Sequence, residues 1–221
     1  METGVIYNED CMETMARMED NSVDLVLTDI PYGVVNRDDN GLRNLDKADA
    51  DEFNIDIYEL LEEMVRIVSG SLYVFCGTEQ VSKLREEMVE NGLSTRLIIW
   101  EKNNPSPMNG GHIWLSGVEC CVYGKFSGAT FNEHCKNTVL KYPCGSSKEH
   151  LTQKPLELFE KLIIISSNKN DIVYDPFIGS GTTAVACEKL DRKWIGSEIS
   201  EKYCKLARER IKIERDQGKL F

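Results

Sequence analysis

The sequence predicts an α/β protein built around a mainly parallel β-sheet. Short apolar runs that are typical of buried strands alternate along the chain with stretches of helical periodicity, and this alternation favours a parallel sheet with helices on its faces. A glycine-rich segment, DPFIGSGTTA (175–184), lies between one such strand and the following helix. The length of 221 residues is enough for a sizeable core, so we expect a single domain over residues 1–221.

The elements follow from the residue patterns in chain order. The apolar run VDLVLTD (23–29) indicates a buried strand, whereas the spacing of apolar residues over 54–68 indicates a helix. Further strands are expected at 71–77, 94–102, 118–125, 171–177 and 193–199, and further helices at 79–92, from Pro155, at 182–190 and after Ser200. Three stretches, 33–53, 103–117 and 127–152, have no regular pattern. Loops of this length are usually functional or mobile.

The composition is that of a soluble globular protein, with 41% hydrophobic and 29% charged residues. The sequence contains no apolar run of transmembrane length, and its acidic start does not resemble a secretory signal. We therefore expect a cytoplasmic protein that does not enter a membrane. The net charge of −11 counts against a nucleic-acid partner. However, acid is concentrated in 38–63 and residues 136–154 are net basic, so a local basic face is compatible with the total.

The eight cysteines are scattered and form no C-x-x-C pair, so reduced and mostly buried thiols are expected. An alternative metal site would combine two histidines and two cysteines, but their spacing fits no known ligand pattern. These four residues are His134, Cys135, Cys144 and His150. No metal is therefore expected.

The glycine-rich segment indicates a nucleotide-like ligand. Gly179 and Gly181 permit a tight turn and close approach of a ligand to the backbone, and the helix from Thr182 directs amide donors toward it. Glu198 ends the next strand, where a carboxylate can accept hydrogen bonds from ribose hydroxyls. A nicotinamide cofactor, S-adenosylmethionine or a purely structural turn would each fit this segment. A phosphate-binding P-loop is excluded because no Gly-Lys-Ser/Thr follows.

The segment TDIPYG (28–33) decides between these alternatives. An exocyclic amine of a nucleobase is a poor nucleophile, and two hydrogen-bond acceptors can release its lone pair. Asp29 supplies one acceptor and the carbonyl of Ile30 a second, which Pro31 holds in place because the residue before proline is extended. Tyr32 offers a ring on which an extruded base can stack. The segment therefore favours methyl transfer to an amino group.

These segments resemble a known family. TDIPYG is similar to the Asp-Pro-Pro-Tyr motif of amino-group DNA methyltransferases, which modify adenine N6 or cytosine N4, and DPFIGSGTT is similar to their Phe-x-Gly-x-Gly cofactor motif. HLTQKPLELFEKLI (150–163) and RLIIWEKNNP (96–105) resemble two further family segments. The catalytic motif precedes the cofactor motif, as in the permuted "beta" group. The resemblance extends from about Val5 to Ile211.

The resemblance implies a Rossmann-like methyltransferase fold with a mainly parallel seven-stranded sheet and permuted motif order. It also implies S-adenosylmethionine as cofactor, double-stranded DNA as partner and a restriction-modification setting. Catalytic roles fall on Asp29, Ile30, Pro31 and Tyr32. The implied cofactor site comprises Asp29, Thr152, Lys154, Pro155, Asp175, Pro176, Phe177, Gly179, Ser180, Gly181, Thr182 and Glu198. Target contacts are expected from Tyr32, Trp100, Asn103, Lys136 and Lys141, and the acidic stretch 38–52 is expected to form a mobile loop beside the site.

Two departures from the family pattern limit the assignment. Ile30 replaces the first proline of the motif, and the region between the two motifs is smaller than in most family members. Asp29 resembles the adenine-modifying members more than the cytosine-modifying ones. Only 103–117 and 127–150 are available as target-recognition segments, so a homodimer or a specificity partner is an expectation. Methylation of adenine N6 by base flipping is the principal hypothesis. Cytosine N4, RNA or a protein amide as acceptor, and a non-catalytic cofactor-binding subunit, remain alternatives.

Overall fold

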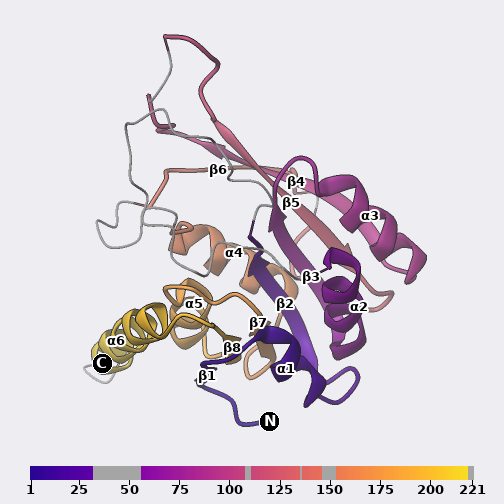
Figure 1. The fold of residues 1–221 in the computed structure, drawn as a ribbon, viewed down its shortest axis with the longest axis vertical. Helices are drawn as coiled ribbons and strands as arrows, with labels where there is room; N and C mark the ends of the chain where they lie inside the picture. The colour runs from indigo at the N-terminus through magenta and orange to yellow at the C-terminus, as the bar shows by residue number, and fades with distance from the viewer. Residues whose placement is uncertain (32–55, 108–110, 135, 146–152, 219–221) are drawn as a thin grey trace.

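The computed structural model describes residues 1–31, 56–107, 111–134, 136–145 and 153–218, and it contains one central sheet with helices on both faces (Figure 1). The strands are β1 (Val5–Tyr7), β2 (Val23–Asp29), β3 (Val68–Cys76), β4 (Ser94–Lys102), β5 (Val118–Lys125), β6 (Val139–Tyr142), β7 (Ile172–Asp175) and β8 (Lys193–Ser197). The helices are α1 (Cys11–Ala16), α2 (Ile57–Ile67), α3 (Val81–Glu90), α4 (Leu156–Ser166), α5 (Thr182–Lys189) and α6 (Glu201–Gly218).

The sheet has the strand order β1-β8-β7-β2-β3-β5-β4-β6. Strand β5 pairs antiparallel with β3 and β4, whereas every other pair of neighbours is parallel. The mainly parallel sheet is therefore confirmed. Its eight strands correct the expected seven. The strand β6 lies in the segment 127–152, which has no regular pattern in the sequence.

Strand β2 explains why its sequence is apolar without interruption. Leu25 and Leu27 point into one hydrophobic core and Val26 points into the other, because successive side chains of a strand face opposite sides of the sheet. Helices α4, α5 and α6 cover the first core, and α1, α2 and α3 cover the second (Figure 1). A strand covered on both faces shows no alternation of polar and apolar residues.

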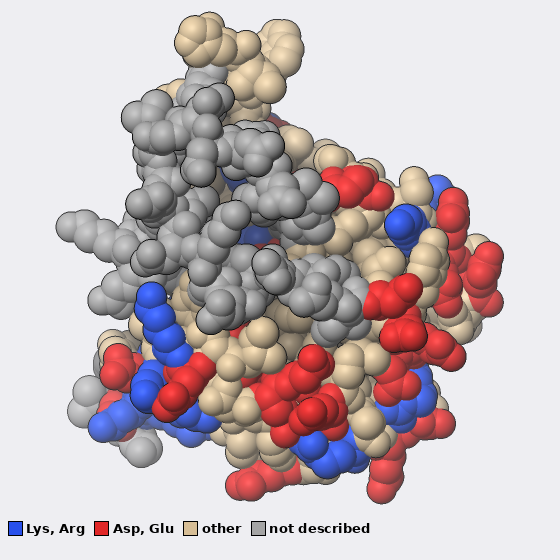
Figure 2. Space-filling model, in the orientation of Figure 1, with Lys and Arg blue, Asp and Glu red and all other residues tan. Residues whose placement is uncertain are grey.

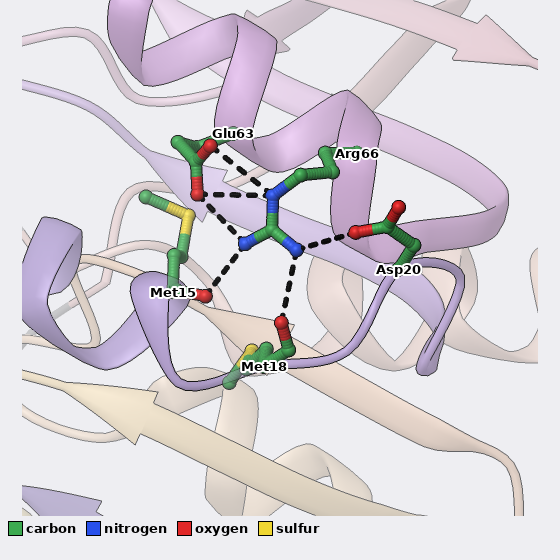
Figure 3. Close-up of polar contacts among 5 residues, drawn as sticks. All are labelled: Met15, Met18, Asp20, Glu63 and Arg66. Atoms are coloured by element: carbon green, nitrogen blue, oxygen red, sulfur yellow. Dashed lines mark hydrogen bonds and ion pairs between the residues drawn. The ribbon is translucent and has the colours of Figure 1, made fainter.

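Arg66, at the end of α2, fastens α2 to the segment that follows α1 (Figure 3). Its guanidinium donates to the backbone carbonyls of Met15 (2.7 Å) and Met18 (2.9 Å), which are carbonyl groups near the end of a short helix. The same group forms ion pairs with Glu63 and Asp20, both at 2.7 Å. The start of β2 is thereby held against α2.

The structure confirms the expected helices and most strand positions and corrects some boundaries. Strand β7 ends at Asp175 and β8 at Ser197, two residues before the predicted ends, because the glycine loop and Glu198 leave the sheet there. Helix α1 and the short strands β1 and β6 were not predicted. Thiols in the described residues are free, and all but the half-buried Cys144 are buried, as expected. Among the described residues, no helix has the length and apolarity needed to cross a membrane.

Candidate active site

The two sequence motifs meet at one edge of the sheet. Strands β2 and β7 are parallel neighbours, with Leu25 opposite Val173 and Val26 opposite Tyr174. From β2 the chain continues to β3 on one side, and from β7 it continues to β8 on the other. Such a reversal of strand order opens a crevice at the carboxyl ends of the strands, which is where α/β proteins bind ligands. Asp29 and Asp175 end the two strands at this crevice.

The turn after β2 is held by the sheet and by α3. The backbone N–H of Ile30 donates to the carbonyl of Phe75 at 3.1 Å, so β2 stays paired with β3 beyond Asp29. Gln80 is buried; its side chain donates to the carbonyl of Pro31 at 3.2 Å and accepts from the N–H of Gly77 at 2.8 Å. The turn is thus fixed on both sides, and the Asp29 side chain is partly exposed beside it.

Lys154 reaches Asp29 from the segment before α4. Its ammonium forms a short ion pair with Oδ2 of Asp29 and a second ion pair with Oε2 of Glu119 at 3.0 Å. The Lys154 side chain is only 7% exposed. Burial alone would lower the pKa of Lys154, but Asp29 and Glu119 outweigh burial and raise this pKa. Lys154 is therefore a buried cation beside the carboxylate that the sequence predicts as the acceptor.

The glycine loop has the backbone that its sequence predicts. Gly179 has φ +50° and Gly181 has φ +84°. Residues other than glycine seldom adopt this backbone conformation. A Cβ atom on Gly181 would lie 2.9 Å from Cβ of Ala207, so α6 also requires glycine here. Thr182 begins α5, and Pro155 immediately precedes α4. The loop can therefore bring its backbone close to a ligand.

Glu198 lies directly beside this loop. One of its carboxylate oxygens accepts from the N–H of Gly179 at 3.0 Å, and the other accepts from the N–H of Ser200 at 2.8 Å. The side chain of Asn8, in the turn after β1, donates to the Glu198 carbonyl at 2.8 Å. These contacts orient a nearly buried carboxylate at the end of β8, as expected for a group that accepts ribose hydroxyls.

Asp175 is buried at the carboxyl end of β7, where the glycine loop begins. Burial raises its pKa to about 7, although hydrogen bonds from the Thr183 hydroxyl and the Phe177 N–H act in the opposite direction. The charge of Asp29 raises this pKa further. Pro176 is buried and Phe177 is half-buried at the start of the loop. Asp175 and Pro176 therefore support the start of the loop, and their contacts with a cofactor stay a prediction.

Sequence analysis missed three residues that hold the site. Gln80 and Glu119 are described above, and Arg210 on α6 is the third. The Arg210 guanidinium donates to the Ser180 carbonyl (2.5 Å), to the Ser180 hydroxyl (2.9 Å) and to the Thr182 hydroxyl (3.5 Å). Its partners are distant in the sequence, so no local pattern reveals them.

Of the predicted target-contact residues that the structure describes, one is buried in the core and three are exposed. Trp100 is buried, and its indole N–H donates to the Tyr142 carbonyl at 2.9 Å, so the structure places it in the core. Asn103 is exposed at the end of β4. Lys136 and Lys141 are exposed and pair with Glu133 and Glu101, each at 3.0 Å. Tyr32, Thr152, the stretch 38–52 and two members of the alternative metal set, Cys135 and His150, lie outside the described residues.

Solved structures define the class of this fold and site. The crystal structure of the M1.HpyAVI-SAM complex matches with a TM-score of 0.73 and 31% identity, over 93% of this chain and 98% of that chain. The cytosine-N4-specific PvuII DNA methyltransferase matches with a TM-score of 0.73 over 98% of this chain and 91% of that chain, but at 17% identity it supports the fold alone. The fold is that of the S-adenosylmethionine-dependent DNA methyltransferases.

Sequence relatives give the family. A family model described as DNA methylase (N6/N4) matches residues 111–209. The type II methyltransferase M.HinfI of Haemophilus influenzae is 30% identical over 94% of this chain and 68% of its own length. The type II methyltransferase M2.DpnII of Streptococcus pneumoniae is 24% identical over 96% of this chain and 91% of its own length. The chain belongs to the N6/N4 DNA methylase family and is a DNA methyltransferase that uses S-adenosylmethionine.

Proposed function

We propose that this enzyme methylates the exocyclic N6 of adenine in double-stranded DNA. The target base would be extruded into the crevice at the carboxyl ends of β2 and β7. The observation that carries the proposal is the pairing of these two strands, because it sets the Asp29 turn directly beside the glycine loop. An amine bound at Asp29 would then be next to a ligand bound along the loop. The related sequences, named as type II methyltransferases, support DNA as the substrate.

The residues of the turn would activate the amine. Asp29 and the carbonyl of Ile30 accept the two N–H hydrogens, and Asp29 stabilises the positive charge that develops as the nitrogen is alkylated. Pro31, held by Gln80, fixes the direction of the Ile30 carbonyl. Tyr32 stacks on the extruded base. An aspartate at the start of this motif favours adenine over cytosine.

The residues around the loop fit S-adenosylmethionine. Glu198 is an oriented carboxylate for the ribose, and Gly179 and Gly181 leave the backbone accessible. When bound, the cofactor would supply a methyl group on a positively charged sulfur. The methyl group would be transferred by in-line displacement, with the sulfur leaving as a neutral thioether. Lys154 and Pro155 would contribute the wall toward α4, and the remaining contacts would come from the segment 175–182. For Thr152 a contact with the cofactor rests on the family resemblance alone. The protein therefore contributes mainly by positioning the two reactants.

The segments 103–117 and 127–150 are proposed as the target-recognition elements of a single methyltransferase domain. Residues 111–117 extend away from the sheet, and Ile113, Trp114 and Leu115 are exposed, Trp114 by 96% (Figure 1, Figure 2). An exposed apolar cluster of this kind usually marks an interaction site. Asn103, Lys136 and Lys141 lie in or beside the same segments. Trp114→Ala is expected to weaken DNA binding about tenfold while leaving S-adenosylmethionine binding unchanged.

A homodimer or a specificity partner remains a prediction, since the two recognition segments are short. Acidic side chains gather around α2 and α3 (Figure 2), which leaves that face unsuited to phosphate contacts. Sedimentation with and without duplex DNA measures the assembly. A monomer both alone and on DNA, with full activity, contradicts this expectation.

The proposal is tested by incubation with S-adenosylmethionine labelled in the methyl group and with mixed-sequence duplex DNA, followed by nucleoside digestion and mass spectrometry. We expect label in N6-methyl-2′-deoxyadenosine. Asp29→Asn should reduce the transfer at least about 100-fold, whereas Asp20→Asn, a matched change at an exposed aspartate, should not. Label in N4-methyl-2′-deoxycytidine would identify cytosine as the acceptor, and label only in RNA or protein offered in parallel incubations would identify those acceptors. Cofactor binding without any transfer would favour a non-catalytic subunit.

A further inference from the structure

Four charged side chains form a continuous chain along the carboxyl edge of the sheet. Lys102, which ends β4, pairs with Glu119 near the start of β5 at 2.8 Å. The other carboxylate oxygen of Glu119 pairs with Lys154 at 3.0 Å, and Lys154 pairs with Asp29. Charges alternate in sign along this chain. The positive and negative members are therefore balanced, two against two.

Asp29 is the most exposed member of this chain of ion pairs, and the other three side chains are more buried. The side chains of Lys102, Glu119 and Lys154 are 14%, 19% and 7% exposed, whereas that of Asp29 is 29% exposed. A buried ammonium is strongly destabilised unless opposite charges lie close to it. Lys154 has two such partners. The ring of Phe75, 5.7 Å from its ammonium, is the apolar side of the same site.

The charges on the inner members support one another. Burial would raise the pKa of Glu119, but Lys154 and Lys102 outweigh it and lower this pKa. Glu119 and Asp29 in turn keep Lys154 protonated. The thiol of Cys121 also faces Lys154, and burial raises its pKa far above the ordinary value, so it adds no charge. The ionisation of Lys154 therefore depends on Asp29 and Glu119 together.

The inner end of the chain closes the base of the segment 103–117. Lys102 and Glu119 flank this segment, and the backbone N–H of Lys102 donates to the Gly117 carbonyl at 2.8 Å. The neighbouring pairs Trp100 with Glu119 and Glu101 with Val118 continue the antiparallel register. The three ion pairs thus connect the base of a proposed recognition segment to the carboxylate of Asp29.

We propose that Glu119 and Lys102 are positioning residues for methyl transfer: Glu119 holds Lys154 against Asp29 and so restrains the rotation of the Asp29 carboxylate, and Lys102 holds Glu119. The proposal rests on the proposed role of Asp29 as acceptor for the amine. Lys154 acts on one oxygen of Asp29, Oδ2. A carboxylate that is fixed before the amine arrives needs no reorganisation in the transition state.

The test compares Glu119→Gln, Glu119→Asp, Lys102→Met and the double variant Lys102→Met/Glu119→Gln. Lys169→Met is the matched control, because it removes an exposed lysine from an ion pair with Asp191. Single-turnover methyl transfer should fall about tenfold in Glu119→Gln and be partly restored in Glu119→Asp. The alkaline limb of the pH–rate profile of Glu119→Gln should move to lower pH. Affinity for S-adenosylmethionine and thermal unfolding should change little.

The double variant should be no slower than Glu119→Gln, because Lys102 acts through Glu119. The pKa of Lys154, followed by NMR of ¹³C-labelled lysine, should fall in Glu119→Gln and not in Lys169→Met. An unchanged Lys154 titration overturns the proposal whatever the activity, and so does a transfer rate equal to that of the control. If the wild type transfers no methyl group to DNA, the proposed function fails instead, and the positioning role fails with it.

Discussion

Gly181 and Ala207 touch across the junction between the glycine loop and helix α6. A Cβ atom on Gly181 would lie 2.9 Å from that of Ala207, and Gly181 itself has φ +84°. Gly181→Ala should therefore lower the free energy of unfolding by about 3 kcal/mol, since backbone strain and overpacking add, and should weaken S-adenosylmethionine binding. Urea denaturation and calorimetry measure the two effects.

The partner variant Ala207→Gly separates the two causes. It removes the overpacking and leaves the backbone strain, so in the double variant the loss should be smaller than the sum of the single losses. The expected coupling is about 1–2 kcal/mol. Strictly additive losses would mean that α6 does not limit the space at Gly181.

Arg210 is expected to be a structural determinant of cofactor affinity. Its guanidinium holds Ser180 and Thr182 from α6, and burial lowers its pKa. Arg210→Met removes these bonds and leaves the Ser180 carbonyl without this donor, so the affinity for S-adenosylmethionine should fall about tenfold. Lys205→Met, which removes an exposed pair with Glu201 on the same helix, is the control. Equal affinities in the two variants would contradict this role.

The fold was largely predictable because most elements have a local signal. Strands β4 and β5 have the predicted bounds, since each is a run of strand-forming residues with clear ends. Strands β1 and β6 have only three and four residues, which is too short for a periodic pattern, and they are strands because a neighbour pairs with them. Both strands were missed for this reason.

The site was predictable where the chemistry is contiguous in the sequence. The Asp29 turn and the glycine loop are short motifs whose residue types indicate a function. Glu198 was found by its position at the end of the strand that follows the loop. Glu119 and Arg210 act through partners that only the fold brings near, so their single residues carry no signal. The position of Trp100 shows the reverse limit: a motif-like segment identified the strand but could not tell which face of it is buried.

Asp175 should make stability depend on pH in an unusual direction. Burial raises its pKa to about 7 in the folded state, from an ordinary value of 3.8. An acid whose pKa is raised by folding stabilises the protein below its unfolded pKa, and this contribution is lost as the pH rises toward the folded pKa. The window therefore runs from about pH 4 to about pH 7.

In Asp175→Asn this contribution is absent. The unfolding free energy of the wild type, relative to that of the variant, should decrease by about 1.4 kcal/mol per pH unit between pH 5 and 6. Urea denaturation at several pH values measures the difference. Parallel pH profiles for the two proteins would show that Asp175 is ionised in the folded state throughout the window.

Gln80 should control the rate of methyl transfer through Pro31. Its side chain bridges the Pro31 carbonyl and the Gly77 N–H, and Gln80→Met keeps the shape while removing both hydrogen bonds. Stability should fall by about 1–3 kcal/mol, because buried polar backbone groups lose their partners. The turn that bears Asp29 would then be less fixed, so single-turnover transfer should fall about tenfold at unchanged S-adenosylmethionine affinity.

The comparison for Gln80→Met is Leu84→Ala, on the same helix. Leu84 is buried in the core between α3 and the sheet and has no polar contact with the turn. This variant should lose at least as much stability, by about 2–5 kcal/mol, yet retain the wild-type transfer rate below its unfolding temperature. If both variants slow transfer in proportion to their lost stability, then Gln80 supports the fold in general and not the direction of the Ile30 carbonyl.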